Sequence, residues 1–288
     1  MIIFKMHGGL GNQLFQYATG RALALRLGCE FRIDSRNTGH RGRPILINQF
    51  NITAKVATPE QIKPYRIDVP YLQRKIYKLL GYNLRKENEA RINDLSPDEL
   101  AAIDIAPINN DYYFEGFYVS EHNFIDYANE ICSEFTLREP FTGKNADIAN
   151  EIANCNSVSL HIRRGDYYEK RHIANFGIPL ADYCHKAMRV IAERVEKPKY
   201  YVFSDDFKWV RESIKFDTDY KFVENNRGNK AHFDLVLMSR CRHNIISNST
   251  FSWWGAWLGS RIHTTDLSLH HIHFFHRHQN VLIHTSII

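Results

Sequence analysis

Residues 157–170 read SVSLHIRRGDYYEK, an apolar run that ends abruptly at two arginines, a glycine and an aspartate. The run SVSLHI has the length of a buried strand, and helical patterns separate it from later runs of the same kind. Strands that alternate with helices indicate a parallel sheet with both faces covered. We therefore predict an α/β fold, with strands at 157–162, 199–204, 220–223 and 243–247 and helices at 181–195, from 206, at 231–241 and from 250.

The first half of the chain shows a similar alternation. A strand at 2–6 precedes a glycine turn, and a helical pattern then continues from Gln13 until Gly28 stops it. A second strand at 29–34 completes a βαβ unit. An aromatic-rich strand is expected at 111–120, and the Pro- and Gly-containing stretch 138–150 is the predicted linker region. Because 288 residues exceed the usual size of one domain, we predict two, 1–145 and 146–288.

Composition narrows the function classes. With 44% hydrophobic and 24% charged residues, the chain resembles an ordinary soluble protein, and its net charge of +5 is scattered, which argues against a dedicated nucleic-acid surface. An anionic small ligand suits this charge equally well. The five cysteines are widely spaced and form no CxxC, which disfavours both a disulfide framework and a zinc site.

The opening MIIFKMHGG has only a short apolar run before a glycine turn, so we expect neither a signal peptide nor a membrane anchor. A cytoplasmic location is therefore expected, with loose association at the inner membrane face as an alternative. The basic segment 71–86 is interpreted as a helix with a solvated face. The sequence leaves the oligomeric state open.

Three polar stretches follow strands of the second half, and ligands of such sheets bind beyond the carboxyl ends of the strands. In the first stretch, Arg163 and Arg164 precede Gly165, which permits a sharp turn before Asp166. Arginine grips phosphate with a planar fork of donors. The alternative is an Arg–Asp ion pair at a strand end. A single histidine such as His161 is more often a core residue whose ring is hydrogen-bonded than a ligand-binding residue.

The second stretch ends a strand at Ser204, Asp205 and Asp206. Capping of the next helix explains most such sequences, although a further acidic residue can read a base or a sugar hydroxyl. The third stretch places four polar residues between a strand and a helix, where free N–H groups favour a phosphate. Its tryptophans are expected to pack. The third stretch comprises Ser247, Asn248, Ser249 and Thr250. Together the three stretches predict a site for a nucleotide diphosphate.

Four motifs also resemble the bacterial α-1,2-fucosyltransferase family: HGGLGNQLFQYATGRALA at 7–24, HIRRGDY at 161–167, FSDD at 203–206 and IISNSTFSWWGAWL at 245–258. The resemblance implies a GT-B-like fold, in which two Rossmann-like domains face each other across a cleft. Domain 1–145 would be the acceptor side and domain 146–288 would bind GDP-β-L-fucose. The implied reaction is an inverting, metal-independent transfer of fucose to a galactose hydroxyl of a glycan, without a cofactor, in O-antigen or surface polysaccharide biosynthesis.

The resemblance also implies roles for single residues. Arg163 matches the arginine that grips the β-phosphate, with Arg164 in support, and His161 would lie against the nucleotide. Asp205 or Asp206 matches an acidic position that reads guanine, and residues 247–250 match the phosphate-binding turn. The facing loop would touch the fucose or the diphosphate, with Asn12 bonded to the transferring region; it comprises Gly8, Gly9, Gly11 and Asn12.

The general base is less defined by the sequence. Asp166 is the preferred residue, Glu169 and His7 are alternatives, and a loose pathway with a weak base is also compatible. One departure from the family concerns the tail, 261–288, which has neither the proline of the usual closing strand nor the tryptophan near the end. Seven of the 15 histidines fall there, and an altered terminus explains them better than a metal site; they are His263, His270, His271, His273, His276, His278 and His284.

Other functions compete with this reading. A dehydrogenase is suggested by Gly9 and Gly11 after a strand and by Asp34 at the end of the next, but the third glycine position is Leu14. The altered tail suggests a non-catalytic GDP-sugar-binding protein. The donor motifs are also compatible with fucose transfer in another linkage or with another GDP-sugar.

Overall fold

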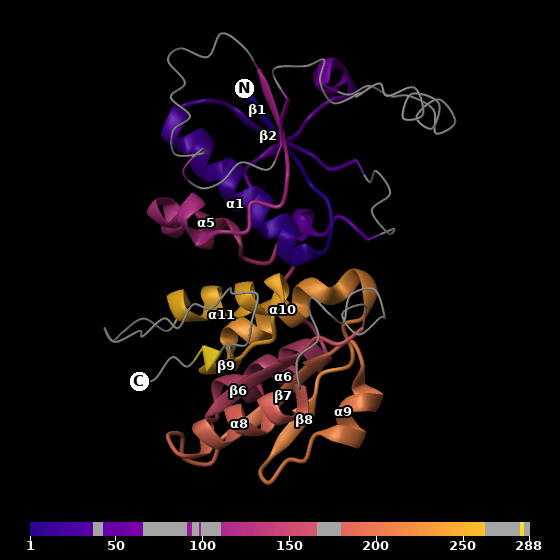
Figure 1. Cartoon of the computed structure of the whole chain (residues 1–288), viewed down its shortest axis with the longest axis vertical. Helices are drawn as coiled ribbons and strands as arrows, with labels where there is room; N and C mark the ends of the chain where they lie inside the picture. The colour runs from indigo at the N-terminus through magenta and orange to yellow at the C-terminus, as the bar shows by residue number, and fades with distance from the viewer. Residues whose placement is uncertain are drawn as a thin grey trace. The chain divides into compact units, whose positions relative to one another are not determined.

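The structure is a computed structural model that describes residues 1–36, 43–65, 91–93, 98, 111–165, 180–262 and 283–284. The chain divides into two compact units, Met1–Thr136 and Leu137–Ile288. The sequence placed this division at 145/146. Helix α6 (Lys144–Ala153) occupies the second half of the stretch predicted as linker, and it belongs to the second unit. Both units are α/β layers, as predicted (Figure 1).

The first unit contains a parallel sheet in the order β3-β2-β1-β5-β4. Its predicted strands at 2–6 and 29–34 are confirmed as β1 and β2, whereas the strand predicted at 111–120 is confined to β5. The helix predicted from Gln13 begins three residues earlier and ends, as expected, at Gly28 in the left-handed conformation. The elements are β1 (Ile2–Lys5), α1 (Leu10–Leu27), β2 (Phe31–Asp34), β3 (Lys55–Val56), α2 (Pro59–Ile62), β4 (Arg91–Asn93), β5 (Tyr112–Glu115) and α5 (Ala128–Glu134).

Close packing fixes α1 on this sheet. A Cβ atom at Gly20 would lie 2.5 Å from the ring of Phe31 and 2.8 Å from that of Phe4, so only glycine lets the helix approach. The ring of Phe4 in turn stacks on Phe114 of β5 at 4.5 Å. The opposite face of the sheet packs Ile3 and Tyr113 against α2 and its surroundings. The sheet is therefore buried on both faces, which explains its continuous apolar strands.

The second unit contains a sheet in the order β10-β9-β6-β7-β8, parallel except for β10. Every strand and helix predicted from 157 to 258 is confirmed, with β6 and β7 matching to the residue. The elements after α6 are β6 (Ser157–Ile162), α8 (Leu180–Ala192), β7 (Lys199–Ser204), α9 (Phe207–Ser213), β8 (Tyr220–Phe222), α10 (Ala231–Arg240), β9 (His243–Ile245), α11 (Thr250–Ile262) and β10 (Ile283–His284).

Two groups of helices cover this second sheet. Helices α8 and α9 pack on one face, against Leu160 of β6 and Val202 of β7. Helices α10 and α11 lie side by side (Figure 1). Gly259 of α11 permits a close approach, since a Cβ there would lie 2.9 Å from the Ser239 carbonyl of α10 and 3.4 Å from Asn244 of β9. The tryptophans of α11 pack as expected, with Trp254 and Trp257 buried.

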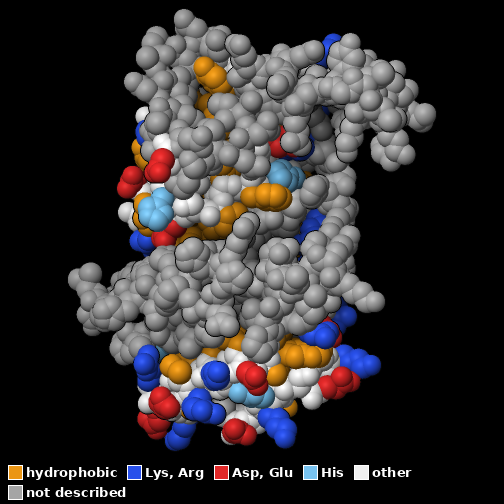
Figure 2. All heavy atoms as spheres, in the orientation of Figure 1, with side chains coloured by type: hydrophobic (Ala, Val, Ile, Leu, Met, Phe, Trp, Pro, Cys, Tyr) orange, Lys and Arg blue, Asp and Glu red, His pale blue; other side chains and the backbone are white. Residues whose placement is uncertain are grey.

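The surface charge agrees with the scattered Lys and Arg of the sequence. On the face drawn in Figure 2, basic and acidic side chains are interspersed over the described surface of the second unit. Among the described residues, no helix is long and apolar enough to cross a membrane. The basic segment 71–86 lies outside the described residues, as does most of the histidine-rich tail.

Candidate functional site

The three polar stretches predicted to share a ligand follow three neighbouring strands. Strand β6 lies between β9 and β7, and all three are parallel. Ile162 pairs with Ser204, and Leu160 pairs with Ile245, so their carboxyl ends meet at one edge of the sheet. Residues 163–165, 204–206 and 247–250 therefore follow the same ends of three adjacent strands, and their sharing of one ligand stays a prediction. We call this set of residues the second-unit edge.

Both arginines of the second-unit edge are held by aspartates from the neighbouring strand end. Nη1 of Arg163 lies 2.6 Å from Oδ2 of Asp205, and Nη1 of Arg164 lies 2.6 Å from Oδ2 of Asp206. The four side chains are between 21% and 29% exposed, so they remain open to a ligand. An Arg–Asp ion pair at a strand end, the alternative foreseen for these arginines, is therefore present, and its aspartates directly follow β7.

Asp205 also holds the backbone of the opposite strand end. Its Oδ1 accepts a hydrogen bond from the backbone N–H of Arg164 at 2.8 Å. A Cβ atom at Gly165 would lie only 2.5 Å from Oδ2 of the same carboxylate. Glycine at 165 thus gives Asp205 room to contact two consecutive arginines. This is a second reason for glycine here, besides the sharp turn predicted from the sequence.

Asp206 caps helix α9, as the capping interpretation predicted. Its Oδ1 accepts from the backbone N–H of Trp209 at 3.1 Å, while Ser204 Oγ accepts from the N–H of Asp206. The Trp209 bond and then Arg164 lower the pKa of Asp206 below its ordinary value. The guanidinium of Arg164 lies 5.0 Å from the Trp209 ring centroid. Arg164 is thus restrained from two sides, which suits a supporting role.

The turn after β9 is organised around serine hydroxyls. Ser249 Oγ accepts from the N–H of Phe251, and its carbonyl accepts from the N–H of Trp253 as α11 begins. Ser247 is buried and contacts Nδ1 of His161 at 3.0 Å. Asn248 and Thr250 are half-buried at the same turn. The turn is therefore held against the end of β6, directly before Arg163 and Arg164.

His161 is a buried histidine with a partner, as the core interpretation predicted. It is 7% exposed and lies 5.5 Å from the ring of Phe251. Burial, and then the positive charge of Arg163, lower its pKa to about 3. The neutral ring can therefore support Ser247 without adding charge. Contact between His161 and a nucleotide stays a prediction.

The glycine turn of the first unit leads directly into α1. Gly8 has φ +78°, a conformation that favours glycine, and a Cβ there would lie 2.9 Å from Nδ2 of Asn12. Gly9 is the N-cap of α1 and provides no capping side chain, while Gly11 is buried in the first turn. Asn12 donates its backbone N–H to the Gly9 carbonyl at 3.0 Å. The loop is thus fixed next to the end of β1.

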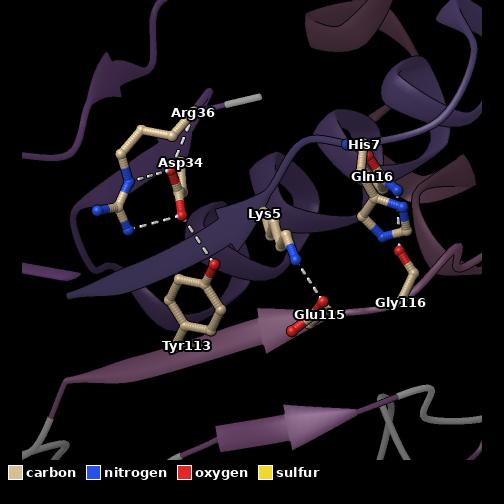
Figure 3. A network of polar contacts seen from close by, with 8 residues as sticks. All are labelled: Lys5, His7, Gln16, Asp34, Arg36, Tyr113, Glu115 and Gly116. Carbon is tan, nitrogen blue, oxygen red and sulfur yellow. Dashed lines mark hydrogen bonds and ion pairs between the residues drawn. The ribbon is translucent and has the colours of Figure 1, made fainter. Parts of the chain in front are cut away.

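Two glutamines, which the sequence reasoning did not single out, anchor this turn. Gln13 donates to the carbonyls of Gly8 and Pro44 and accepts from the N–H groups of Leu46 and Ile47. Gln16 accepts from the N–H of His7 and donates to the Gly116 carbonyl, both at 3.0 Å (Figure 3). Both side chains are fully buried. The sequence signal that could have identified them is the presence of two polar residues within an apolar helical pattern.

The dehydrogenase reading is not supported by the environment of Asp34. Its carboxylate is fully buried and accepts hydrogen bonds from Arg36 and from Tyr113 Oη, the latter at 2.8 Å (Figure 3). Burial alone would raise the pKa of Asp34, but these hydrogen bonds outweigh it and lower the pKa. The carboxylate is therefore engaged by Arg36 and by Tyr113 of β5.

A buried polar cluster in the second unit was also missed by the sequence reasoning. Asn145 of α6 and Asn226 exchange two hydrogen bonds at 2.8 and 2.9 Å, and Asn226 also donates to Asp234 of α10 at 2.8 Å. Burial raises the pKa of Asp234 to about 7. The sequence signal that could have identified this cluster is an aspartate within the apolar run FDLVLM. The cluster ties α6 to α10 within the second unit.

Some predicted residues lie outside the described part of the chain. Asp166 and Glu169 are among them, so their roles stay predictions. Within the described ranges, no three His, Cys, Asp or Glu side chains gather into a group that could hold a metal ion. His7, the third candidate base, is described, and its ring lies 4.7 Å from that of Phe117.

Comparisons with known proteins identify relatives over almost the whole chain. The family model "Glycosyl transferase family 11" matches residues 1–270. The O-antigen biosynthesis glycosyltransferase WbnK of Escherichia coli is 32% identical over 88% of this chain and 89% of its own length. An alpha-1,2-colitosyltransferase of Escherichia coli is 30% identical over 90% of this chain and 87% of its own length. Galactoside alpha-(1,2)-fucosyltransferase 1 of Leontopithecus chrysomelas is 26% identical over 91% and 67%.

Solved structures support the fold. The fucosyltransferase NodZ from Bradyrhizobium matches with a TM-score of 0.54 and 16% identity, covering 88% of this chain and 91% of that one. A NodZ alpha-1,6-fucosyltransferase soaked with GDP-fucose matches with a TM-score of 0.53 and 15% identity, covering 89% and 92%. The predicted GT-B fold, built from two Rossmann-like units, is thereby confirmed.

Proposed function

Because the chain belongs to glycosyl transferase family 11, we propose that it transfers L-fucose from GDP-β-L-fucose to a galactose hydroxyl of a glycan, forming an α-1,2 linkage. The observation that carries this proposal is the second-unit edge, where two partly exposed arginines lie beside a serine turn at the start of a helix. Guanidinium groups and free helical N–H groups are the donors that bind a diphosphate.

The proposed transfer is an inverting displacement. The bond between the anomeric carbon of fucose and the diphosphate oxygen breaks, and its electron pair leaves with GDP. The acceptor oxygen forms the new bond from the opposite side, and its hydroxyl proton goes to a base, for which Asp166 is the first choice and Glu169 and His7 are alternatives. Arg163 and Arg164 would stabilise the charge that develops on GDP, so the chemistry needs no metal ion.

The aspartates of the second-unit edge acquire a role from the structure. Asp205 holds Arg163 and the Arg164 backbone, and Asp206 holds Arg164 while capping α9. This geometry supports both as positioning residues for the arginines. Each carboxylate is also about one-quarter exposed, so this positioning role leaves either residue accessible for guanine recognition.

A second donor is favoured by one of the comparisons. The relative named alpha-1,2-colitosyltransferase is 30% identical to this chain, and the galactoside fucosyltransferase is 26% identical. Transfer of colitose from GDP-colitose to the same kind of hydroxyl is therefore the alternative function. The second-unit edge suits both donors, since both would carry the same GDP group.

The test is GDP release by the purified chain in the presence of EDTA, with GDP-fucose or GDP-colitose as donor and N-acetyllactosamine or lactose as acceptor. Acceptor-dependent release that Arg163→Ala abolishes would support the proposal, and linkage analysis of the product would test the α-1,2 assignment. GDP-fucose binding without release with either acceptor would instead support a GDP-sugar-binding protein. A requirement for a divalent ion would contradict the metal-independent mechanism.

A further inference from the structure

The loop after β5 exposes an aromatic ring beside the glycine turn of the first unit. Phe117 is 38% exposed, although large aromatic side chains are usually well buried. Its ring lies 4.7 Å from the imidazole of His7, and its Cε1 lies 3.4 Å from the position that a Cβ of Gly8 would take. The ring is therefore held at the carboxyl end of β1 and β5, where α/β sheets bind ligands.

The backbone of the loop presents Phe117 by inserting its neighbour into the core. Tyr118 has φ +50°, which is unfavourable for a residue with a side chain. Its ring is buried 5.3 Å from that of Phe4, and its carbonyl accepts from the N–H of Ser120 and from Asn123 Nδ2. With Tyr118 turned inward, Phe117 on one side of it and Val119 on the other are exposed.

Polar groups suited to hydroxyls end the two strands that lead into the glycine turn and into the loop of Phe117. Lys5 and Glu115 end the paired strands β1 and β5 and form an ion pair at 2.5 Å, with side chains 12% and 23% exposed (Figure 3). The single side chain of Gln16 fixes both His7 and Gly116, the residues that flank the ring's position. The groups are therefore positioned before any ligand binds.

We propose that Lys5, His7, Glu115 and Phe117 form the subsite for the acceptor sugar. This inference rests on the proposed function and assigns its acceptor side. One face of a galactopyranose ring presents the C–H groups of C3, C4 and C5, which pack on the Phe117 ring by dispersion and apolar burial. The carboxylate of Glu115 accepts, and the ammonium of Lys5 donates, hydrogen bonds with the hydroxyls at the sugar's rim.

The first experiment compares Phe117→Ala, Phe117→Tyr and the matched control Val119→Ala, which truncates a side chain of equal exposure two residues away. KM for N-acetyllactosamine is measured at saturating donor, and GDP affinity is measured by calorimetry. We expect Phe117→Ala to raise the acceptor KM about tenfold and Phe117→Tyr to restore it to within about twofold of wild type. GDP affinity should stay unchanged in all three variants, as should the acceptor KM of Val119→Ala.

An unchanged acceptor KM in Phe117→Ala would overturn the inference. Equal losses of acceptor and GDP affinity, with a lower melting temperature, would overturn it too, because Phe117 would then be a packing residue. Saturation-transfer NMR with methyl β-D-galactopyranoside needs no turnover: transfer to H3, H4 and H5 that Phe117→Ala abolishes is expected, and equal transfer in both proteins contradicts the subsite. Failure of the wild type to bind GDP would instead refute the proposed function.

Discussion

Gly165→Ala tests whether Asp205 holds the arginines of the second-unit edge. The added methyl group would lie 2.5 Å from Oδ2 and 3.3 Å from Cγ of Asp205, and contacts below 3.0 Å force a displacement. The Asp205 side chain is short and is held at both oxygens, by Arg163 at 2.6 Å and by the Arg164 N–H at 2.8 Å. The carboxylate must therefore give up at least one of these bonds.

The size of the effect follows from those two bonds. A hydrogen bond to a charged group contributes about 1.5–3 kcal/mol. The ion pair, being partly exposed, contributes only about 0.2–1 kcal/mol. Allowing for partial relaxation, we expect a stability loss of about 1–2 kcal/mol and, for a unit of this size, a melting temperature lower by roughly 2–8 °C. Release of Arg163 should weaken GDP binding by about tenfold, equivalent to about 1.4 kcal/mol.

The assay combines calorimetric titration with GDP and thermal unfolding, and Gly143→Ala is the control. Gly143 belongs to the same unit and has φ +50° and ψ −132°, so alanine there costs stability of about 1–3 kcal/mol through backbone strain. A Cβ at 143 would meet no atom within 4 Å, so GDP affinity should be unchanged. The control thus separates lost stability from a lost binding geometry.

The opposite result has a clear physical meaning. Alanine in place of a glycine whose backbone tolerates it stabilises a protein by about 0.4–1 kcal/mol, because the unfolded chain loses freedom. If Gly165→Ala raises the melting temperature and leaves GDP affinity unchanged, the methyl group fits without moving Asp205. The role of Asp205 as the residue that positions Arg163 would then be refuted.

Three further predictions concern the second unit. Arg163→Ala should lower acceptor-dependent GDP release by about 100-fold or more, and Arg163→Lys should recover only part of it, because lysine keeps the charge but loses the fork; full recovery would contradict bidentate binding. The pKa of His161 is lowered to about 3, so the unfolded chain binds a proton below about 6.5 that the folded chain does not. Stability should therefore fall as pH drops through this window, by up to about 1.4 kcal/mol per pH unit, and His161→Gln should reduce that slope in thermal unfolding. Asp234 has the opposite sign: its pKa is raised to about 7, so between about 3.8 and 7 the folded chain holds a proton that the unfolded chain has lost, and stability falls as pH rises through this window and levels off above it. Asp234→Asn, which keeps an acceptor for Asn226, should gain more in melting temperature over the wild type at pH 8 than at pH 5; equal shifts at both pH values would exclude this cause.

Local patterns in the sequence predict most of the second unit. The runs SVSLHI and KYYVFS are continuous and apolar because β6 and β7 are covered on both faces, so their limits can be predicted to the residue. The start of α1 was placed too late, because Gly9 and Gly11 resemble a turn although the helix begins at Leu10. Residues whose conformation depends on distant packing, such as Tyr118 at φ +50°, give no comparable signal.

The candidate site could be predicted in outline. The rule that ligands bind at the carboxyl ends of parallel strands brought together the stretches around Arg163, Asp205 and Ser247, and the sheet order confirms it. Which residues contact each other could not be predicted, because Arg163 and Asp205 are 42 positions apart and pair only through the register of β6 and β7. The cluster of Asn145 and Asn226 depends on the same kind of long-range contact.

The pairing of Arg163 and Arg164 with aspartates has a consequence for selectivity among anions. Each guanidinium carries its own counterion, so an incoming anion gains only the difference between its attraction and that of the carboxylate it weakens. Inorganic phosphate or sulfate brings charge and little else, and is therefore a poor competitor. A nucleotide diphosphate adds contacts from its base and sugar. In the proposed transfer, the same compensation would weaken the hold on the GDP product and so favour its release.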